Sequence, residues 1–131
     1  MRAIAGWDGG ALVFAKEVPD PENFGVVAYA EDGSVADIVE KAGRVDTRFD
    51  APPSNDAVVG LYCYPPDVFD RIDTLQPSSR GELEITDVNR AYAQEGRLVV
   101  KRLEGWWEDA GKHWHHFAEI GSRIEATGVN K

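Results

Sequence analysis

Residues 57–64, Ala-Val-Val-Gly-Leu-Tyr-Cys-Tyr, form a run that is apolar on both faces of an extended chain. A strand with one face in water alternates polar and apolar side chains, whereas a strand covered on both sides is a continuous apolar run. This run therefore predicts a central strand of a sheet, with other layers packed against both of its faces.

Three further runs of β-type residues surround it, at residues 11–18, 24–30 and 35–40. The first run meets Pro19 and Pro21, which cannot continue a central strand. The other two flank an Asp32-Gly33 step, which favours a hairpin because glycine accepts positive φ. We therefore expect these two strands to pair antiparallel, and we expect a long exposed loop over residues 42–55.

The remaining segments have helical patterns, with one more strand among them. The expected elements are a short helix after Pro65 and Pro66 that closes before Pro77, a helix from about Glu82 or Thr86 to Gln94, a strand over residues 98–103, and an amphipathic helix over about residues 114–126. Strands separated by helices indicate the α/β class, here one domain with a mixed β-sheet and flanking helices.

The chain has the size of one domain, and it is acidic. Its 131 residues carry 14 Lys and Arg against 23 Asp and Glu, a formal net charge of −9. Because it lacks a basic patch, neither nucleic acid nor an anionic membrane is an expected partner.

No apolar run approaches the ~20 residues that span a bilayer, and the first residues do not resemble a signal peptide. The single Cys63 excludes an intramolecular disulfide, so we expect Cys63 to be a core residue of a cytoplasmic protein.

Two short segments could hold a phosphorylated ligand. Arg80 stands beside a glycine and an expected helix start, which together can bind a phosphate through a guanidinium fork and backbone N–H groups. The alternative is a solvated surface arginine. Glu40 and Lys41 at a strand end could clamp a sugar hydroxyl and a phosphate, and the alternative there is an exposed ion pair.

Metal chemistry has two candidate positions. Asp109 follows a tryptophan pair and could ligate Mg²⁺, although one carboxylate is only half of such a site. His113 and His116 are spaced to face the same way on a helix, with His115 beside them. No second cluster supplies further ligands, so a surface histidine group is the favoured interpretation. Nucleophile motifs and a Walker-type phosphate loop are absent from the sequence.

Five motifs follow one another along the chain. They are Asp-Pro-x-x-Phe-Gly-Val-Val at 20–27, Val-Glu-Lys at 39–41, Ser-Asn-x-Ala-Val-x-Gly-Leu-Tyr at 54–62, Pro-Ser-x-Arg-Gly-Glu-Leu-Glu-Ile-Thr-Asp at 77–87, and Gly-Trp-Trp-x-Asp-x-Gly-Lys at 105–112. In this order they resemble the glucose-1-phosphate thymidylyltransferases and their sugar-nucleotidyltransferase relatives. The run at 80–87 is the most specific piece.

The resemblance implies part of a Rossmann-like nucleotidyltransferase fold and a sugar 1-phosphate ligand. It implies that Gly25 and Glu40 hold sugar hydroxyls, that Lys41 and Arg80 hold the sugar phosphate, that Val58 lies against the sugar, and that Asp109 is one of two aspartates on Mg²⁺. In such enzymes the sugar phosphate attacks the α-phosphorus of a nucleoside triphosphate and releases pyrophosphate.

Other parts of the family pattern have no counterpart in these 131 residues. The Gly-x-Gly-Thr-Arg loop that cradles the nucleotide phosphates, the base-recognition residues and the second metal aspartate are not found. The chain therefore resembles the sugar-binding, C-terminal half of such an enzyme. We expect a truncated, catalytically inactive relative with weak sugar-phosphate binding and no metal bound to the isolated chain. Two alternatives stay open: a protein-interaction or regulatory module on the same fold, and one half of a split active nucleotidyltransferase.

A fold divided at this point would leave a strand edge and apolar faces uncovered. Residues 11–18 and 57–64 are the strands expected to lie near that break. The expected partner is a second copy of the chain in an apolar homodimer. A full-length nucleotidyltransferase or the missing N-terminal half is the alternative partner.

Overall fold

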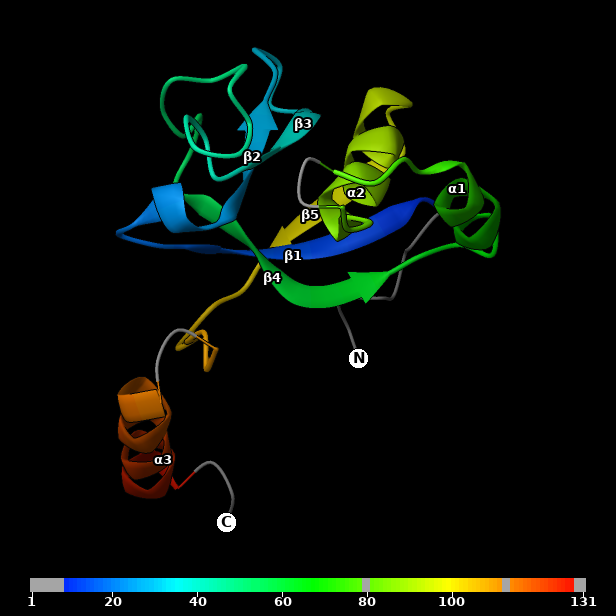
Figure 1. Ribbon diagram of the computed structural model, residues 1–131. Helices are drawn as coiled ribbons and strands as arrows, with labels where there is room; N and C mark the ends of the chain where they lie inside the picture. Colours follow the sequence, from blue (N-terminus) through cyan, green and yellow to red (C-terminus); the bar gives the residue numbers. More distant parts are fainter. Residues whose placement is uncertain (1–8, 79–80, 112–113, 129–131) are drawn as a thin grey trace.

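The computed structural model describes residues 9–78, 81–111 and 114–128. Five strands form one mixed sheet in the order β3-β2-β4-β1-β5 (Figure 1). The strands are β1 (Ala11–Glu17), β2 (Gly25–Tyr29), β3 (Val35–Glu40), β4 (Asp56–Cys63) and β5 (Leu98–Arg102). β1 runs parallel to β5 and antiparallel to β4, so the expected mixed α/β sheet is confirmed.

Four helical segments accompany the sheet: the 3-10 helix η1 (Pro21–Asn23), α1 (Val68–Thr74), α2 (Ile85–Gln94) and α3 (Trp114–Thr127). In Figure 1, α1 and α2 lie on one side of the sheet, and α3 stands apart from it on the other side. The helix α2 ends before Gly96, whose φ of 68° belongs to the left-handed region that glycine adopts without strain. The stop expected at Gly96 is therefore confirmed.

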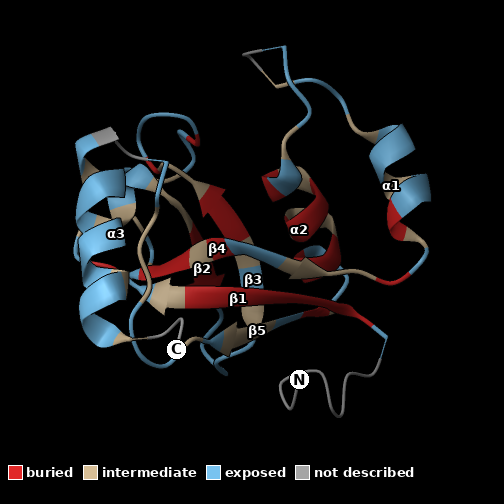
Figure 2. Ribbon diagram, turned by 90° about the horizontal axis from the view of Figure 1, so that it is seen from below, coloured by how far each residue is buried: buried red, intermediate tan, exposed pale blue. Residues whose placement is uncertain are grey.

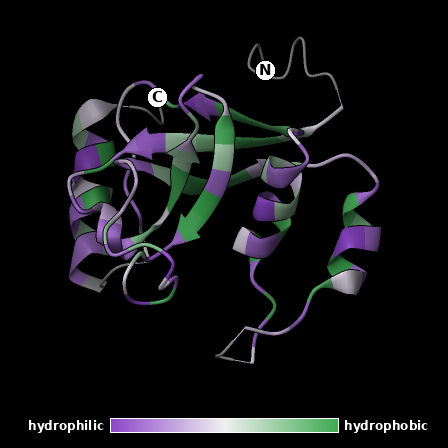
Figure 3. Ribbon diagram, turned by 90° about the horizontal axis from the view of Figure 1, so that it is seen from above, coloured by the Kyte–Doolittle hydropathy of each residue, from purple (hydrophilic) through white to green (hydrophobic). Residues whose placement is uncertain are grey.

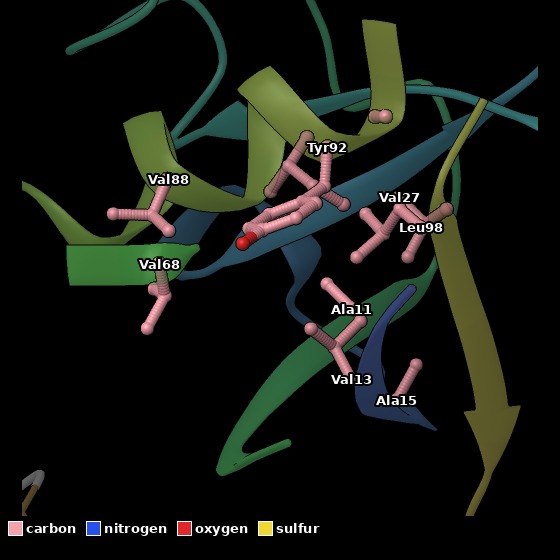
Figure 4. Packing of buried hydrophobic residues seen from close by; sticks show 10 residues of the cluster. Ala11, Val13, Ala15, Val27, Val68, Val88, Tyr92 and Leu98 are labelled. Carbon is pink, nitrogen blue, oxygen red and sulfur yellow. The ribbon is translucent and has the colours of Figure 1, made fainter. Parts of the chain in front are cut away.

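The core lies between the sheet and α2. Figure 4 shows the ring of Tyr92 beneath α2, facing small and branched side chains of the strands. Tyr92 is fully buried, and its hydroxyl donates a hydrogen bond of 2.9 Å to Asp67 at the start of α1. The guanidinium of Arg71 in α1 lies over the ring, at 4.1 Å from its centroid. Packing on Tyr92 thus joins both helices to the sheet.

The opposite face of the sheet carries a smaller cluster. Leu12, Phe14 and Val59 are buried there, and Leu103 and Trp107 of the segment after β5 pack against them. Figure 2 shows β1 buried along most of its length, whereas α3 is exposed over most of its surface. Figure 3 shows the same division by hydropathy, with hydrophobic stretches along the strands and more hydrophilic residues along the helices.

The antiparallel hairpin expected around Asp32 and Gly33 is confirmed. β2 and β3 pair antiparallel from Gly25 opposite Glu40, and Gly33 in the turn has a φ of 82°. Asp32 stabilises the turn by accepting hydrogen bonds from the backbone and the hydroxyl of Ser34. The loop expected over residues 42–55 is also free of strands and helices.

β4 is central, as expected, but the prediction that it is covered on both faces is wrong for its second half. The pairing with β1 shifts register so that three residues of β4, 59–61, stand opposite the single residue Phe14 of β1. Such a bulge bends a strand locally. Leu61 is consequently 52% exposed, and Cys63 is only partly buried.

The two strands expected beside an open edge, β1 and β4, are not the edge strands of this sheet, which are β3 and β5. β1 has a neighbour on each side, because β4 and β5 both pair with it. β4 meets β2 only where Ala57 stands opposite Val26. In the described part of the chain, the second half of β4 therefore pairs on one side only. Among the described helices, none is long and apolar enough to cross a membrane.

Candidate functional site

The hairpin places Gly25 and Glu40 directly opposite each other on neighbouring strands. A Cβ atom added to Gly25 would lie 2.8 Å from Oε2 of Glu40, which is closer than a carbon atom can approach. The missing side chain therefore leaves the space in which the Glu40 carboxylate lies. The resemblance to the sugar nucleotidyltransferases implies that both residues hold sugar hydroxyls, and the structure places them side by side.

Thr86, in the first turn of α2, fixes the carboxylate from the other side. Its hydroxyl donates a hydrogen bond of 2.9 Å to Oε2 of Glu40, across 46 residues of sequence. Thr86 is buried and Glu40 is half-buried, so this bond is partly shielded from water. The other carboxylate oxygen, Oε1, lies 3.8 Å from Nζ of Lys41. Glu40 is thus held in one orientation between a strand, a helix start and a cation.

Lys41 has an unusual backbone conformation. Its φ is 43°, in the left-handed region that few residues other than glycine enter. The conformation is held by three hydrogen bonds: its N–H donates to the carbonyl of Phe24, and its carbonyl accepts from Arg44 and Val45. Strained residues of this kind cluster at binding sites.

Val58 and Tyr62 reach the same face of the sheet from β4. Both are partly buried, and both pack against the core cluster beneath α2. Burial raises the pKa of the Tyr62 hydroxyl, and the negative charge of Glu40 raises it further. Gly25, Glu40 and Lys41 thus lie together where β2, β3 and the start of α2 meet, whereas Val58 packs against the core cluster from β4.

A pocket of about 250 Å³ opens beside Glu40. Its lining comes from β3, the loop after it, and the start of α2: Glu40, Val45, Asp46, Thr47, Arg48, Ser78, Glu84, Thr86, Asp87 and Arg90. Asp46 is buried in the wall and accepts hydrogen bonds from Arg48 at 2.6 Å and from Arg90 at 3.1 Å. The bonds from Arg48 hold the pKa of the Asp46 carboxyl below its ordinary value.

Arg80 lies outside the described residues. The described residues on either side of it, Ser78 and Glu84, both line the pocket, and the Ser78 hydroxyl donates a 2.8 Å hydrogen bond to Glu84. The N–H of Gly81 donates a hydrogen bond of 2.8 Å to the carbonyl of Ser78.

Asp109 is in a different place. It lines a groove on the opposite face of the sheet, beside Val59, Leu61, Leu103 and Trp107. One of its carboxylate oxygens accepts the N–H of Gly111 at 2.8 Å. Among the described residues there is no group of three or more His, Cys, Asp or Glu that could hold a metal ion. Asp109 alone does not make a magnesium site.

The histidine group is divided. His113 lies outside the described residues, and His116 faces Glu108 at 3.1 Å and Glu119 at 3.7 Å. Arg123 also approaches Glu108, at 3.4 Å, and stacks over Trp106. These contacts tie α3 to the segment that follows β5.

Sequence reasoning missed the role of Thr86 and the ionic wall of the pocket. The sequence indicates Thr86 as a possible helix start within the motif at 77–87, and nothing in a linear sequence pairs it with Glu40. Asp46 and Arg48 fall in a loop without periodicity, so the ion pairs of Asp46 with Arg48 and with Arg90 of α2 depend on how the loop folds back. Only the excess of Asp and Arg in that loop could have suggested an ionic network.

Comparison with known proteins places this geometry in context. The sequence model that describes the nucleotidyl transferase family matches residues 3–126 of this chain. A low-salt glycan biosynthesis nucleotidyltransferase of Haloferax volcanii is 41% identical over 86% of this chain and 30% of its own length. A glucose-1-phosphate thymidylyltransferase of Xanthomonas campestris is 45% identical over 86% of this chain and 37% of its own length.

A solved structure agrees with these relatives. A crystal structure assigned as a glucose-1-phosphate thymidylyltransferase of Bacillus anthracis matches 89% of this chain and 44% of its own, with 38% identity and a TM-score of 0.71. The chain thus spans about a third of the length of the two curated relatives and less than half of the solved one. The match over nearly all of its residues, in sequence and in fold, shows that the chain belongs to the nucleotidyl transferase family, among the sugar nucleotidyltransferases.

Proposed function

We propose that this chain binds a sugar 1-phosphate beside Glu40, with glucose 1-phosphate as the model ligand. The observation that carries the proposal is the Glu40 carboxylate, held over Gly25 by the Thr86 hydroxyl at the edge of a pocket. A carboxylate is an acceptor-only group with about four lone-pair positions. Because Thr86 occupies one of them, the others can accept hydrogen bonds from neighbouring sugar hydroxyls.

The phosphate needs cations, because acidic residues line much of the pocket. Arg48 and Arg90 are already bonded to Asp37 and Asp46, so they are not the proposed phosphate ligands. Lys41 lies 3.8 Å from the Glu40 carboxylate, and in the sequence Arg80 stands between Ser78 and Glu84, which both line the pocket. We assign the phosphate to Lys41 and Arg80, and the sugar hydroxyls to Glu40 and to the backbone of Gly25.

The remaining part of the proposed site is apolar. Val58 of β4 is partly exposed on the same face, and we assign it the contact with the sugar ring. A sugar buries its C–H faces on such side chains while its hydroxyls reach polar groups. Asp109 could contribute one ligand to a bound Mg²⁺. The proposed binding of the sugar phosphate includes no step on the metal.

We further propose that the chain does not transfer nucleotides by itself. Phosphoryl transfer depends on positioning and on electrostatic stabilisation of the phosphates. The 131 residues contain no glycine-rich loop before a helix that could cradle a triphosphate. Two alternatives remain: an interaction module, and one half of a split enzyme whose other half is a separate polypeptide. The cytoplasm is the proposed location.

Calorimetry with glucose 1-phosphate tests the binding proposal. A charge-assisted hydrogen bond contributes about 1.5–3 kcal/mol, so we expect a Kd in the millimolar range that rises about tenfold or more in Glu40→Gln and in Arg80→Ala. Glu31→Gln, in the exposed hairpin turn, is the matched control and should bind like the wild type. Wild-type affinity in Glu40→Gln would overturn the assignment.

An assay for pyrophosphate release from dTTP and glucose 1-phosphate, with Mg²⁺, tests the proposed lack of transfer. We expect no turnover by the purified chain. Turnover by the chain alone would contradict the proposal. Turnover only after addition of lysate from the source organism would favour the split enzyme.

A further inference from the structure

The chain turns sharply after β3, between Glu40 and Asp46, and this turn carries Lys41. The N–H of Asp46 donates to the carbonyl of Glu40 at 3.0 Å, and the carbonyl of Asp46 accepts the N–H of Gly43 at 3.1 Å. Two residues of the turn have positive φ, Lys41 at 43° and Gly43 at 74°. A residue with a side chain keeps such a φ only where surrounding contacts enforce it. The conformation of Lys41 therefore depends on what holds the turn closed.

Asp46 is the member of this turn whose side chain binds a helix. Its carboxylate is buried, and Oδ2 accepts hydrogen bonds from Arg48 at 2.6 Å and from Arg90 at 3.1 Å. Arg48 belongs to the loop itself and is exposed. Arg90 belongs to α2, and its side chain is only 22% exposed. Arg90 is thus the more enclosed of the two cations and the one that joins Asp46 to α2.

The guanidinium of Arg90 binds four acceptors at once. Nη2 donates to Asp46 and also to the carbonyl of Ile38, at 3.0 Å. Nε donates to Asp37 of β3 at 3.0 Å, and Nη1 donates at 2.7 Å to Asp87, three residues earlier on α2. A planar fork with donors on every edge can satisfy such a set, whereas a single ammonium group cannot. Arg90 therefore fixes Asp46 relative to both β3 and α2, the two elements that supply the carboxylate and the hydroxyl of the proposed sugar site.

We propose that Arg90 is a positioning residue for Lys41 and that it acts through Asp46. This inference rests on the proposed function, in which the Lys41 ammonium group binds the sugar phosphate. Arg90 has no assigned contact with the ligand, because acceptors of the chain itself already bind its guanidinium. Without Arg90 the turn loses this tie to α2. The Lys41 backbone then returns toward a common φ, and its ammonium group leaves the place where the phosphate binds.

NMR spectra of the ligand-free chain test the positioning directly. Arg90→Gln removes the guanidinium, and Arg90→Lys keeps the charge but not the fork. In both variants we expect the amide resonances of Lys41, Gly43 and Asp46 to shift. We also expect the backbone ¹³C shifts of Lys41, which report φ and ψ, to move toward those of a residue with negative φ. If Arg90→Gln does not fold, the milder Arg90→Lys decides the test.

Arg71→Gln is the matched control for loss of a charge and of stability. The side chain of Arg71 is 18% exposed, binds the carboxylates of Asp67 and Glu95, and does not line the pocket. Its removal should also make the chain easier to unfold, but it should leave the Lys41 resonances where the wild type has them. Unchanged Lys41 resonances in the Arg90 variants would overturn the proposal. So would equal changes of these resonances in Arg71→Gln.

A titration with glucose 1-phosphate separates this inference from the proposed function. We expect the Kd to rise about threefold or more in both Arg90 variants and to stay at the wild-type value in Arg71→Gln. Arg90→Gln combined with Asp46→Asn should bind no more weakly than Asp46→Asn alone, because both changes remove the same tie.

Wild-type affinity in the Arg90 variants, or an additive loss in the double variant, would overturn the role of Arg90. Absence of binding by the wild type would instead overturn the proposed function. The ligand-free resonances of Lys41 would then still decide whether Arg90 holds the turn.

Discussion

The hydroxyl of Thr86 and the carboxylate of Glu40 are joined by a half-buried hydrogen bond of 2.9 Å, although one belongs to the start of α2 and the other to the end of β3. The bond leaves the second carboxylate oxygen of Glu40 facing Lys41. It connects the helix to the hairpin at the point where the pocket opens. The proposed sugar site therefore depends on the packing of α2 as much as on the hairpin residues.

Removal of this hydroxyl should weaken ligand binding. In Thr86→Val the shape is nearly kept but the hydrogen bond is lost, so Glu40 is freer to turn. We expect glucose 1-phosphate to bind about three- to tenfold more weakly, corresponding to the usual 0.5–1.5 kcal/mol of one hydrogen bond. Thr86→Ser should restore most of the affinity. Thr74→Val, on the exposed helix α1, is the control, and equal affinity in Thr86→Val and Thr74→Val would show that Thr86 does not position Glu40.

Gly25→Ala should affect binding more than stability. The added Cβ would lie 2.8 Å from Oε2 of Glu40, which is the end of a flexible side chain that can move away. We expect a loss of binding with less than about 1 kcal/mol change in the free energy of unfolding, because side-chain movement relieves the contact. Gly121→Ala on α3, where a Cβ meets nothing within 4 Å, should leave binding intact. Unchanged binding in Gly25→Ala would place the sugar elsewhere.

The contribution of Asp46 to the stability of the folded chain should depend on pH. Hydrogen bonds from Arg48 hold the pKa of its carboxyl below the ordinary 3.8. The stability that comes from the lowered pKa is present above the ordinary value and is lost as the pH falls through the lower value of the folded state. We expect Asp46→Asn to cost about 1–3 kcal/mol at pH 7 in urea unfolding, and the cost to shrink near pH 3.

Asp73→Asn, exposed on α1, changes the net charge by the same amount and serves as the control for this experiment. It should alter the free energy of unfolding by less than about 0.5 kcal/mol. If Asp46→Asn were as mild as Asp73→Asn at pH 7, the ionic wall would have no part in stability.

The elements of the fold were predictable where local chemistry determines them. The Asp32-Gly33 turn, the stop at Gly96 and the apolar run of β4 each act through neighbouring residues, and the hairpin, the end of α2 and the central strand follow. The bulge at residues 59–61 was not predictable, because it depends on the register between β4 and β1. The exposure of Leu61 follows from that register.

The site was predictable only through the family pattern, and only in part. Gly25 and Glu40 meet because the hairpin register places them opposite each other, which the turn at Gly33 sets. Asp109 belongs to the same motif series but lies on the other face of the sheet. Sequence order carries no information about faces beyond one element, so the separation of Asp109 from Glu40 had to come from the structure.

An amide NMR titration of the wild-type chain with glucose 1-phosphate tests the central claim most directly. The account predicts saturable shifts, with a Kd in the millimolar range, that are largest at Gly25, Lys41 and Thr86 and that require about tenfold more ligand or greater in Glu40→Gln. The titration of Glu31→Gln should match that of the wild type. Shifts centred on the groove beside Asp109, or shifts at Gly25 and Thr86 that saturate in Glu40→Gln at the wild-type concentration of ligand, would contradict it.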